Sequence, residues 1–338
     1  MAQAQPSPDA SGAVPFIDIS AYRSGDPATK LRIAREIDAA CRSIGFLVVS
    51  GHGIPDRVFG EADKATRALF DLPIETKALY RPGPIGYRGY HGLESNAIAY
   101  SLDDRNAPPD LFERFGIGRV DLDPADPYYS ANDMARFAYA PNIWPAELPN
   151  FMPIMTAYYR AMDSLSLTLM RLFALALGVE EHWFDDKVDK HMTTLVVQNY
   201  PDQVEPPRPG QLRCGPHSDY GSLTILKTEN KPGGLEVKTK SGEWAPVQVI
   251  PGTLIINLGD LMAQWTNDRW VSTMHRVVNP PRDKAIGSRR QSLIFFHQPN
   301  YDALIECIPT CLDGKPAKYR PITSGEHLNT KVSKQLAV

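Results

Sequence analysis

The sequence predicts an α+β chain that is mainly β in its second half, where a β-barrel or sandwich is buttressed by N-terminal and central helices. Apolar residues recur at helical spacing in several segments before residue 178, whereas short alternating strands dominate after it. Thirty prolines punctuate the chain, as the many turns of a β-rich fold require. No low-complexity linker divides the 338 residues, so we expect one folding unit.

Amphipathic spacing predicts four helices. They cover residues 27–44, 55–73, 148–179 and 324–338. The second is expected to stop at Pro73, and the third to end at Gly178, because glycine commonly terminates helices. Between the second and third, residues 81–149 are rich in loops and aromatic side chains, which indicates a binding surface rather than core.

Strand-like runs bounded by Gly, Pro and Asn form the rest of the chain. Two lie near the N-terminus, at 14–20 and 45–55. Six more follow the longest helix, at 191–201, 221–229, 233–250, 252–267, 271–281 and 289–300. Several alternate with period two, and their even spacing favours antiparallel pairing in a sandwich or barrel.

Composition narrows the classes of function. A net charge of −3 gives no general attraction to nucleic acid or to anionic membrane, and no apolar run approaches the ~20 residues of a membrane span. Residues 1–13 lack the pattern of a secretory signal and are expected to form a flexible leader. The four cysteines show no metal or disulfide spacing, which favours reduced thiols in the cytoplasm.

His217 and Asp219 stand two apart in GPHSDYGSLTIL, immediately before an alternating apolar run. Residues i and i+2 of a strand face the same side, so both side chains are expected to point into the barrel. His275, in STMHRVVNP, lies on a strand that could return beside the first. Two imidazoles and one carboxylate on one face leave three positions open on an octahedral metal, as in non-haem Fe(II) oxygenases. Zinc more often takes a closed tetrahedral set.

Arg290 and Ser292, in RRQSLIFF, are also two apart and therefore share a face. A guanidinium beside a hydroxyl in a barrel interior can hold a carboxylate, and a buried arginine without an anion is costly. One small molecule satisfies both the metal and the arginine: 2-oxoglutarate, whose keto-acid end chelates iron. Arg289 competes for the carboxylate, but strand alternation and the Arg-x-Ser spacing favour Arg290.

The chain resembles the isopenicillin N synthase-like branch of the 2-oxoglutarate/Fe(II)-dependent dioxygenases over nearly its whole length. The N-terminal part resembles that family in VPFIDIS, GFLVVSGHGIP, LFDLPIETKALY and GYRGY. The second half resembles it, in the same order, in PHSDYGSLTIL, STMHRVVNP and RRQSLIFFHQPNYDALIECIP. STMHRVVNPP and ITSGEHL are more similar to microbial members than to plant members.

The resemblance implies a double-stranded β-helix, or jelly-roll, core. It implies that His217, Asp219 and His275 ligate iron and that Arg290 and Ser292 clamp the far carboxylate of 2-oxoglutarate. It also suggests how the single folding unit is divided. We expect an N-terminal helical and strand region over 14–120, and a catalytic jelly-roll with a C-terminal helical tail over 121–338.

One strand departs from the family pattern. Plant members usually show Asn-Tyr-Tyr-Pro before the metal motif, whereas this chain has VQNYP. Tyr200 takes the place of the second tyrosine and is expected to donate to an oxygen of 2-oxoglutarate. Gln198 takes the place of the asparagine, where it either donates likewise or contacts the substrate.

The resemblance also suggests residues that border the substrate. Arg88 and Tyr90 lie in GYRGYHGLESNAIAY, and Arg88 either recognises an anionic or carbonyl group or stacks on neighbouring tyrosines at the surface. Phe295 and His297 either line the barrel or pack in its wall. The C-terminal helix either lids the site, as in some relatives, or is a simple surface helix.

These observations predict an enzyme that uses Fe(II), 2-oxoglutarate and O2 to oxidise, most simply to hydroxylate, a C–H bond of a small polar metabolite. Succinate and CO2 would be released. Two alternatives stay open: an oxidase of the same fold that needs no 2-oxoglutarate, as in isopenicillin N synthase, and a non-catalytic binding barrel. A zinc hydrolase is disfavoured, because no general-base carboxylate accompanies the triad. No nucleic acid, membrane or obligate protein partner is expected.

Overall fold

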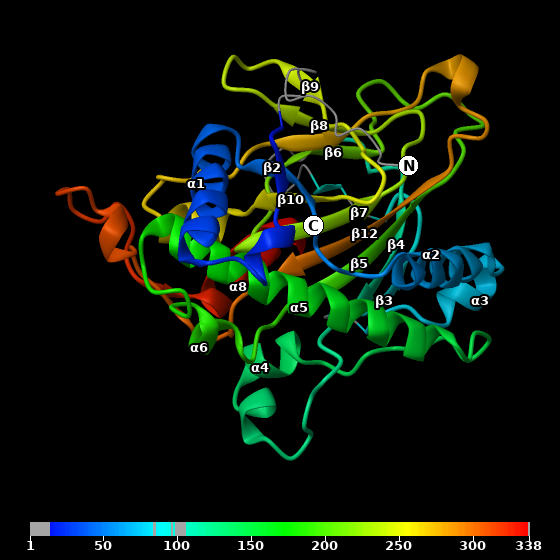
Figure 1. Ribbon diagram of the computed structural model, residues 1–338. Coiled ribbons are helices and arrows are strands. Elements are labelled where there is room, and N and C mark those ends of the chain that lie inside the picture. Colours follow the sequence, from blue (N-terminus) through cyan, green and yellow to red (C-terminus); the bar gives the residue numbers. More distant parts are fainter. Residues whose placement is uncertain (1–13, 84–85, 96, 99–105, 337–338) are drawn as a thin grey trace.

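The computed structural model describes residues 14–83, 86–95, 97–98 and 106–336. The predicted leader, residues 1–13, lies outside these described residues. Figure 1 shows two β-sheets stacked face to face, with the long helix α5 crossing the outer side of the larger sheet. This arrangement is the jelly-roll expected from the sequence.

The larger sheet has eight strands in the order β1-β2-β10-β7-β12-β5-β4-β3. Its strands are β1 Phe16–Asp18, β2 Phe46–Ser50, β3 Gly89–His91, β4 Glu113–Ile117, β5 Thr194–Tyr200, β7 Leu223–Thr228, β10 Leu254–Leu258 and β12 Arg290–His297. The β1–β2 pair is parallel and the other pairs are antiparallel. Strands from both sides of residue 120 thus share one sheet.

The smaller sheet has four antiparallel strands in the order β6-β11-β8-β9. They are β6 Cys214–His217, β8 Leu235–Lys238, β9 Trp244–Pro246 and β11 His275–Val277. A separate two-stranded sheet joins β13 Leu304–Ile305 to β14 Ile322–Thr323.

Helices α1, α2 and α5 pack together in the main core on the outer face of the larger sheet. The helices of the described residues are α1 Pro27–Ser43, α2 Asp56–Asp71, α3 Ile74–Ala78, α4 Asp133–Ala138, α5 Phe151–Leu177, α6 Asp185–Val188, α7 Asp260–Trp265 and α8 Ser324–Leu336. The α5 helix buries one continuous apolar face against the sheet, and α1 and α2 pack beside it. It ends where predicted, because Gly178 adopts the left-handed conformation (φ 73°) that a residue with a Cβ rarely takes.

Strand alternation separates two interiors. On β12, Leu293 and Phe295 point to the helices and join the main core, whereas Ile294 and Phe296 point between the sheets. The space between the sheets holds two smaller apolar clusters. One contains Phe46, Val48, Leu235, Val237 and Ile255, and the other Phe112, Tyr200, Cys214 and Val277. A cavity lined by both polar and apolar side chains touches members of both clusters, and the predicted metal and 2-oxoglutarate residues lie there.

The structure corrects two expectations about elements. Residues 252–267 form a strand and then a helix, β10 and α7, rather than one strand. The chain turns at Gly259, where a Cβ would lie 2.3 Å from the Gly221 carbonyl oxygen, and Leu261, Met262 and Trp265 then bury at helical spacing. Residues 81–149 were expected to form a binding surface rather than core, but β3 and β4 extend the larger sheet and Tyr90, Phe115 and Ile117 belong to the main core.

Within the described ranges, none of the helices combines the length and the apolar character that a membrane span requires.

Candidate active site

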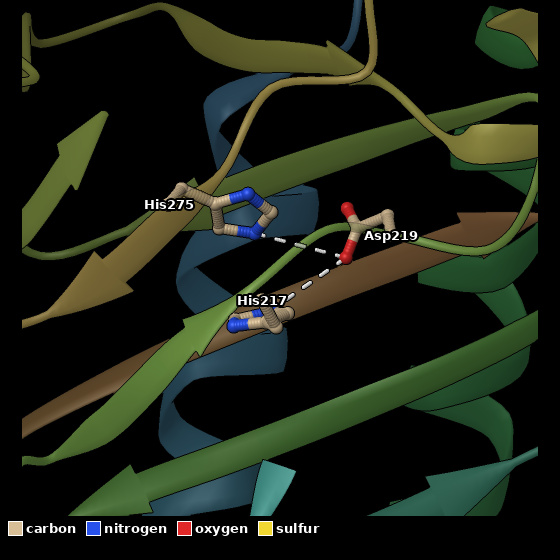
Figure 2. A group of neighbouring side chains, drawn as sticks. All are labelled: His217, Asp219 and His275. Carbon is tan, nitrogen blue, oxygen red and sulfur yellow. Dashed lines mark ion pairs between the residues drawn. The ribbon is translucent and has the colours of Figure 1, made fainter. Parts of the chain in front are cut away.

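Three side chains from two places in the sequence, His217 and Asp219 from one and His275 from the other, meet between the sheets (Figure 2). His217 ends β6 and His275 begins β11, and the two residues face each other across the strand pair. Asp219 Oδ1 lies 3.9 Å from His217 Nε2 and 3.7 Å from His275 Nε2. One donor atom from each residue falls within 4.8 Å of the others, and all three residues are buried.

Asp219 reaches this position differently from the expectation. Strand β6 ends at His217, so Asp219 lies in the following loop and not on the same strand. Its backbone carbonyl accepts a 2.7 Å hydrogen bond from the amide of Asp260 at the start of α7. That bond ties the loop to the end of β10, and the carboxylate still turns toward the histidines.

Backbone carbonyls fix the orientation of both imidazoles. His217 Nδ1 lies 2.9 Å from Gly215 O, and His275 Nδ1 lies 3.1 Å from Thr273 O. A carbonyl can only accept, so each Nδ1 carries the proton and each Nε2 keeps a lone pair directed at the centre of the triad. A hydrogen bond from the ring nitrogen that does not face the metal orients histidine ligands in metal sites generally.

The carboxylate is oriented in the same way. Asp219 Oδ2 accepts from Thr224 Oγ1 at 2.5 Å and from Asn257 Nδ2 at 2.6 Å, which leaves Oδ1 toward the histidines. Burial by itself would raise the pKa of Asp219, but the two histidines and these hydrogen bonds outweigh it and lower the pKa. Burial, and then the neighbouring His275, lowers the pKa of His217 to about 4. His217 is therefore a neutral imidazole and Asp219 an ionised carboxylate near pH 7.

A small cavity of about 480 Å³ joins the triad to Arg290 and Ser292 on β12. Arg290 is only 2% exposed, and its Nη2 donates to Thr228 Oγ1. Its Nε and Nη1 have no hydrogen-bond partner among the described residues. Ser292 Oγ lies 2.8 Å from the same Thr228 hydroxyl. A buried guanidinium with unused donors and no ion pair among the described residues is the expected receptor for a carboxylate.

Arg289, the alternative candidate for binding the 2-oxoglutarate carboxylate, does not face the small cavity. Its Nη1 lies 2.5 Å from Asp71 Oδ1 at the end of α2, on the helix side of the sheet. Because neighbouring strand residues alternate, only Arg290 faces the small cavity.

Tyr200 and Gln198 lie on β5, the strand paired with β12, and both line the small cavity. The Tyr200 hydroxyl donates to Gln198 Oε1 at 2.5 Å, and the ring centroid lies 5.2 Å from the Arg290 guanidinium carbon. Since its oxygen is occupied, the Gln198 amide has its NH2 group left to donate.

A larger cavity of about 1030 Å³, open to solvent, lies on the other side of the triad. His217, Asp219 and Gln198 line it, and so does Arg88. Arg88 is not a surface residue, because only 5% of it is exposed.

Three of the residues expected to contact substrate lie away from this cavity. Tyr90 is in the main core, and its hydroxyl donates to Glu113 Oε2 at 2.6 Å. Phe295 packs in the same core against Tyr159, with ring centroids 5.0 Å apart. His297 Nδ1 lies 2.6 Å from Ser222 Oγ behind the sheet. Phe295 and His297 lie away from the cavity because side chains alternate between the two faces of a strand. On β12 the residues that share a face with Arg290 carry even numbers.

Several cavity residues were missed by sequence reasoning. Phe296 replaces Phe295 in the wall, Tyr87 accompanies Arg88, and Leu328 reaches the cavity from α8. Arg114 is also in the wall, directly across the strand pair from Gln198. Strand alternation could have identified Arg114. It follows Glu113, whose carboxylate bonds Tyr90 in the main core, so the side chain of Arg114 must point to the opposite face of the sheet.

Two family models match the chain. Residues 14–147 match the model described as "non-haem dioxygenase in morphine synthesis N-terminal", and residues 192–299 match the 2OG-Fe(II) oxygenase superfamily. Validamycin A dioxygenase of Streptomyces hygroscopicus subsp. limoneus is 34% identical, over 88% of this chain and 80% of that protein. Homoarginine-6-hydroxylase 2-ODD-233 of Oryza sativa subsp. japonica is 33% identical, over 95% of this chain and 96% of that protein.

Solved structures agree with these matches. A full-length Neurospora crassa protein, solved in complex with alpha-KG and thymine, superimposes with a TM-score of 0.80 at 32% identity, covering 95% of this chain and 96% of that one. A putative 2OG-Fe(II) oxygenase family protein of Caulobacter crescentus superimposes with a TM-score of 0.82 at 30% identity, covering 96% and 99%.

The stacked sheets and the His-Asp-His site define a non-haem iron oxygenase. With the matches above, the chain belongs to the isopenicillin N synthase-like 2OG-Fe(II) oxygenases and is a dioxygenase that uses Fe(II) and 2-oxoglutarate. Its relatives come from bacteria, fungi and plants, so the microbial assignment stays a prediction.

Proposed function

We propose that His217, Asp219 and His275 hold the iron and that Arg290, Ser292 and Tyr200 receive 2-oxoglutarate. The observation that carries this proposal is the single small cavity that joins the three donor groups to a buried arginine with two unused nitrogens. The keto-acid end would face the donor groups, and the far carboxylate would satisfy the guanidinium.

When bound, the iron and 2-oxoglutarate supply the oxidising power for attack on a C–H bond, with release of succinate and CO2. The protein supplies the surroundings. The Gly215 and Thr273 carbonyls hold the imidazoles, and Thr224 and Asn257 hold the carboxylate, so the donor set is already oriented before a metal enters. The two apolar clusters between the sheets border the small cavity and limit the water around a bound cosubstrate.

We propose hydroxylation of a small, polar metabolite that binds in the larger cavity, with Gln198 and Arg88 among its contacts. Both cavities share His217 and Asp219, so a molecule in the larger one lies beside the metal site. The names of the relatives are consistent with small substrates, since they refer to validamycin A, to homoarginine and, for one solved complex, to thymine.

We further propose that the enzyme acts in the cytoplasm. All four cysteines are unpaired, and three of them are buried, which suits a reducing compartment.

The test uses the visible charge-transfer band of an anaerobic Fe(II)–2-oxoglutarate complex. We expect the wild-type protein to show a weak band and to release succinate, above background, when air is admitted. His217→Ala should lose both signals, because the donor set falls to two. Arg290→Met should keep metal binding. It should raise the 2-oxoglutarate concentration that gives half of the full band by about 100-fold or more, since a charge-assisted pair between the guanidinium and the carboxylate is lost.

Arg119→Gln is the matched control, because that arginine bonds the backbone carbonyls of residues 189 and 191, and none of these three residues lines either cavity. It should behave as wild type. Full succinate release by His217→Ala would remove that residue from the ligand set, and turnover without added 2-oxoglutarate would favour the oxidase alternative.

A further inference from the structure

Asp260, the first residue of α7, makes hydrogen bonds to three separate segments of the chain. Its backbone amide donates to the Asp219 carbonyl at 2.7 Å. Its carboxylate accepts from Ser272 Oγ at Oδ1, at 2.7 Å, and from Lys331 Nζ at Oδ2. Asp260, Ser272 and Lys331 line neither cavity, so these bonds act on the site only through other residues.

The backbone of α7 holds the loop that carries the metal-binding carboxylate. The amides of Asp260 and Leu261 donate to the carbonyls of Asp219 and Tyr220 at 2.7 and 3.3 Å. These amides belong to the first turn of a helix, where the helix itself supplies no acceptor. The start of α7 therefore fixes the height at which Asp219 enters the triad.

The Oδ1 bond holds the segment that leads to the second histidine. Ser272 lies three positions before His275, and the carbonyl of the next residue, Thr273, accepts from His275 Nδ1 at 3.1 Å. The Thr273 hydroxyl donates to the Ile44 carbonyl at 2.6 Å. The segment is thus tied to β2 by Thr273 and to α7 by Ser272, and both ties set the direction of the imidazole.

The Oδ2 bond reaches the wall of the larger cavity. Lys331 belongs to α8, whose residues Leu328 and Val332 line that cavity. The ammonium group also lies 5.9 Å from the ring centroid of Tyr220, another wall residue. An acid in the first turn of a helix is favourable by itself, but that preference requires neither a serine nor a lysine partner.

We propose that Asp260 is a positioning residue whose two carboxylate oxygens have separate roles. Oδ1, together with the backbone amide, sets the spacing of Asp219 and His275 for the metal, whereas Oδ2 holds α8 against the larger cavity. This inference rests on the function proposed above, since it requires that the triad holds iron. It follows that metal affinity and attachment of α8 can be changed independently of each other.

The test uses two readouts on the full-length protein. Anaerobic Fe(II) titration with saturating 2-oxoglutarate, followed by the charge-transfer band, gives the metal affinity, and hydrogen exchange of the α8 amides reports its attachment. Asp260→Ala should weaken Fe(II) binding about tenfold or more. It should also speed α8 exchange about two- to fivefold, because a partly exposed ion pair is lost.

Three variants separate the two roles. Ser272→Ala should weaken Fe(II) binding about tenfold and leave α8 exchange unchanged. Lys331→Ala should speed α8 exchange and leave Fe(II) affinity unchanged. Asp260→Asn should behave as Lys331→Ala does, because an amide still bonds the Ser272 hydroxyl but carries no charge for the lysine. The double variant Asp260→Ala/Ser272→Ala should bind Fe(II) no more weakly than Asp260→Ala, since both changes remove the same bond.

Asp121→Ala is the matched control, because it removes a surface ion pair with Arg160 and neither residue lines a cavity. It should match wild type in both readouts. A merely structural role for Asp260 would lower stability toward urea without changing the Fe(II) affinity of the folded protein.

If Asp260→Ala does not fold, Ser272→Ala and Asp260→Asn decide. Wild-type Fe(II) affinity in Ser272→Ala, or an equal loss of affinity in Asp260→Asn, overturns the role of Oδ1. Unchanged α8 exchange in Lys331→Ala overturns the role of Oδ2. A wild-type protein without the band would defeat the proposed metal site, whereas a normal wild-type band with unaffected variants defeats only the inference about Asp260.

Discussion

The two oxygens of Asp219 have different surroundings, and this difference shapes the metal site. Oδ2 is occupied by the Thr224 hydroxyl and the Asn257 amide, whereas Oδ1 lies 3.7 to 3.9 Å from the two histidine nitrogens. A carboxylate held at one oxygen presents the other in a fixed direction. Thr224 and Asn257 therefore act on the metal only through Asp219.

Replacement of Asn257 by alanine should weaken Fe(II) binding by about 10- to 100-fold, because one of the two donors that orient Asp219 is lost. Anaerobic metal titration followed by the charge-transfer band measures the effect. Asn132→Ala is the control, since Asn132 caps α4 far from the triad along the chain. An unchanged metal affinity in the Asn257 variant would show that Thr224 alone is sufficient.

At the scale of the element, strand β12 contributes side chains both to the cavities between the sheets and to the main core under the helices. Its even-numbered residues from Arg290 to Phe296 face the cavities, and its odd-numbered residues face α5 and the main core. Phe295 and Phe296 are adjacent and chemically identical, yet one is fully buried and the other partly exposed to the larger cavity.

The pair Phe295→Ala and Phe296→Ala tests this division. Phe295→Ala should lower the free energy of unfolding by about 3–5 kcal/mol, since it leaves a void in a close-packed core. Phe296→Ala should cost clearly less stability, because its ring already borders empty space. Urea unfolding measures both variants. Equal losses would mean that the two faces are packed alike.

Helix α8 closes the larger cavity from the C-terminal end of the chain. Leu328 and Val332 line the cavity, and Lys331 bonds the Asp260 carboxylate at the start of α7. The helix is thus part of the cavity wall, which favours the lid alternative over a simple surface helix.

Removal of residues 324–338 should open this wall. We expect stronger fluorescence of an apolar dye such as anilinonaphthalene sulfonate, because apolar cavity residues become accessible, while the Fe(II)–2-oxoglutarate band persists. Lys331→Ala, which breaks only the ion pair, is the control and should bind less dye than the truncated protein. Loss of the band would show that α8 also supports the metal site.

At the scale of the whole molecule, buried histidines make stability depend on pH. Burial lowers the pKa of His91 and of His297 to about 3, and that of His327 to about 4. In the unfolded chain the same groups have a pKa near 6.5. Below that value the unfolded state binds protons that the folded state does not, so acid favours unfolding.

The free energy of unfolding should therefore fall as pH decreases from about 6.5 toward 4. Each of these histidines contributes about 1.4 kcal/mol per pH unit within that window. Urea unfolding at pH 7, 6 and 5 measures the slope, and His297→Gln should reduce it by one histidine's share. Equal stability at pH 7 and pH 5 would contradict the prediction.

Local sequence patterns determined much of the secondary structure and the identity of the metal and carboxylate residues. The apolar stripe and Gly178 define α5, alternation defines β5, β7 and β12, and the motif residues point to a metal and a carboxylate, because each of these signals depends on neighbours within a few positions. The same alternation, applied from Arg290 onward, would have excluded Phe295 and His297 from the cavity.

Other features depended on the tertiary structure. Asn257 meets Asp219 across 38 positions of sequence, and Arg114 meets Gln198 only because β4 pairs with β5 in one register. Asp219 reaches the triad from a loop and not from a strand. These contacts follow from which distant strands pair and which faces they bury, and no local pattern encodes that choice.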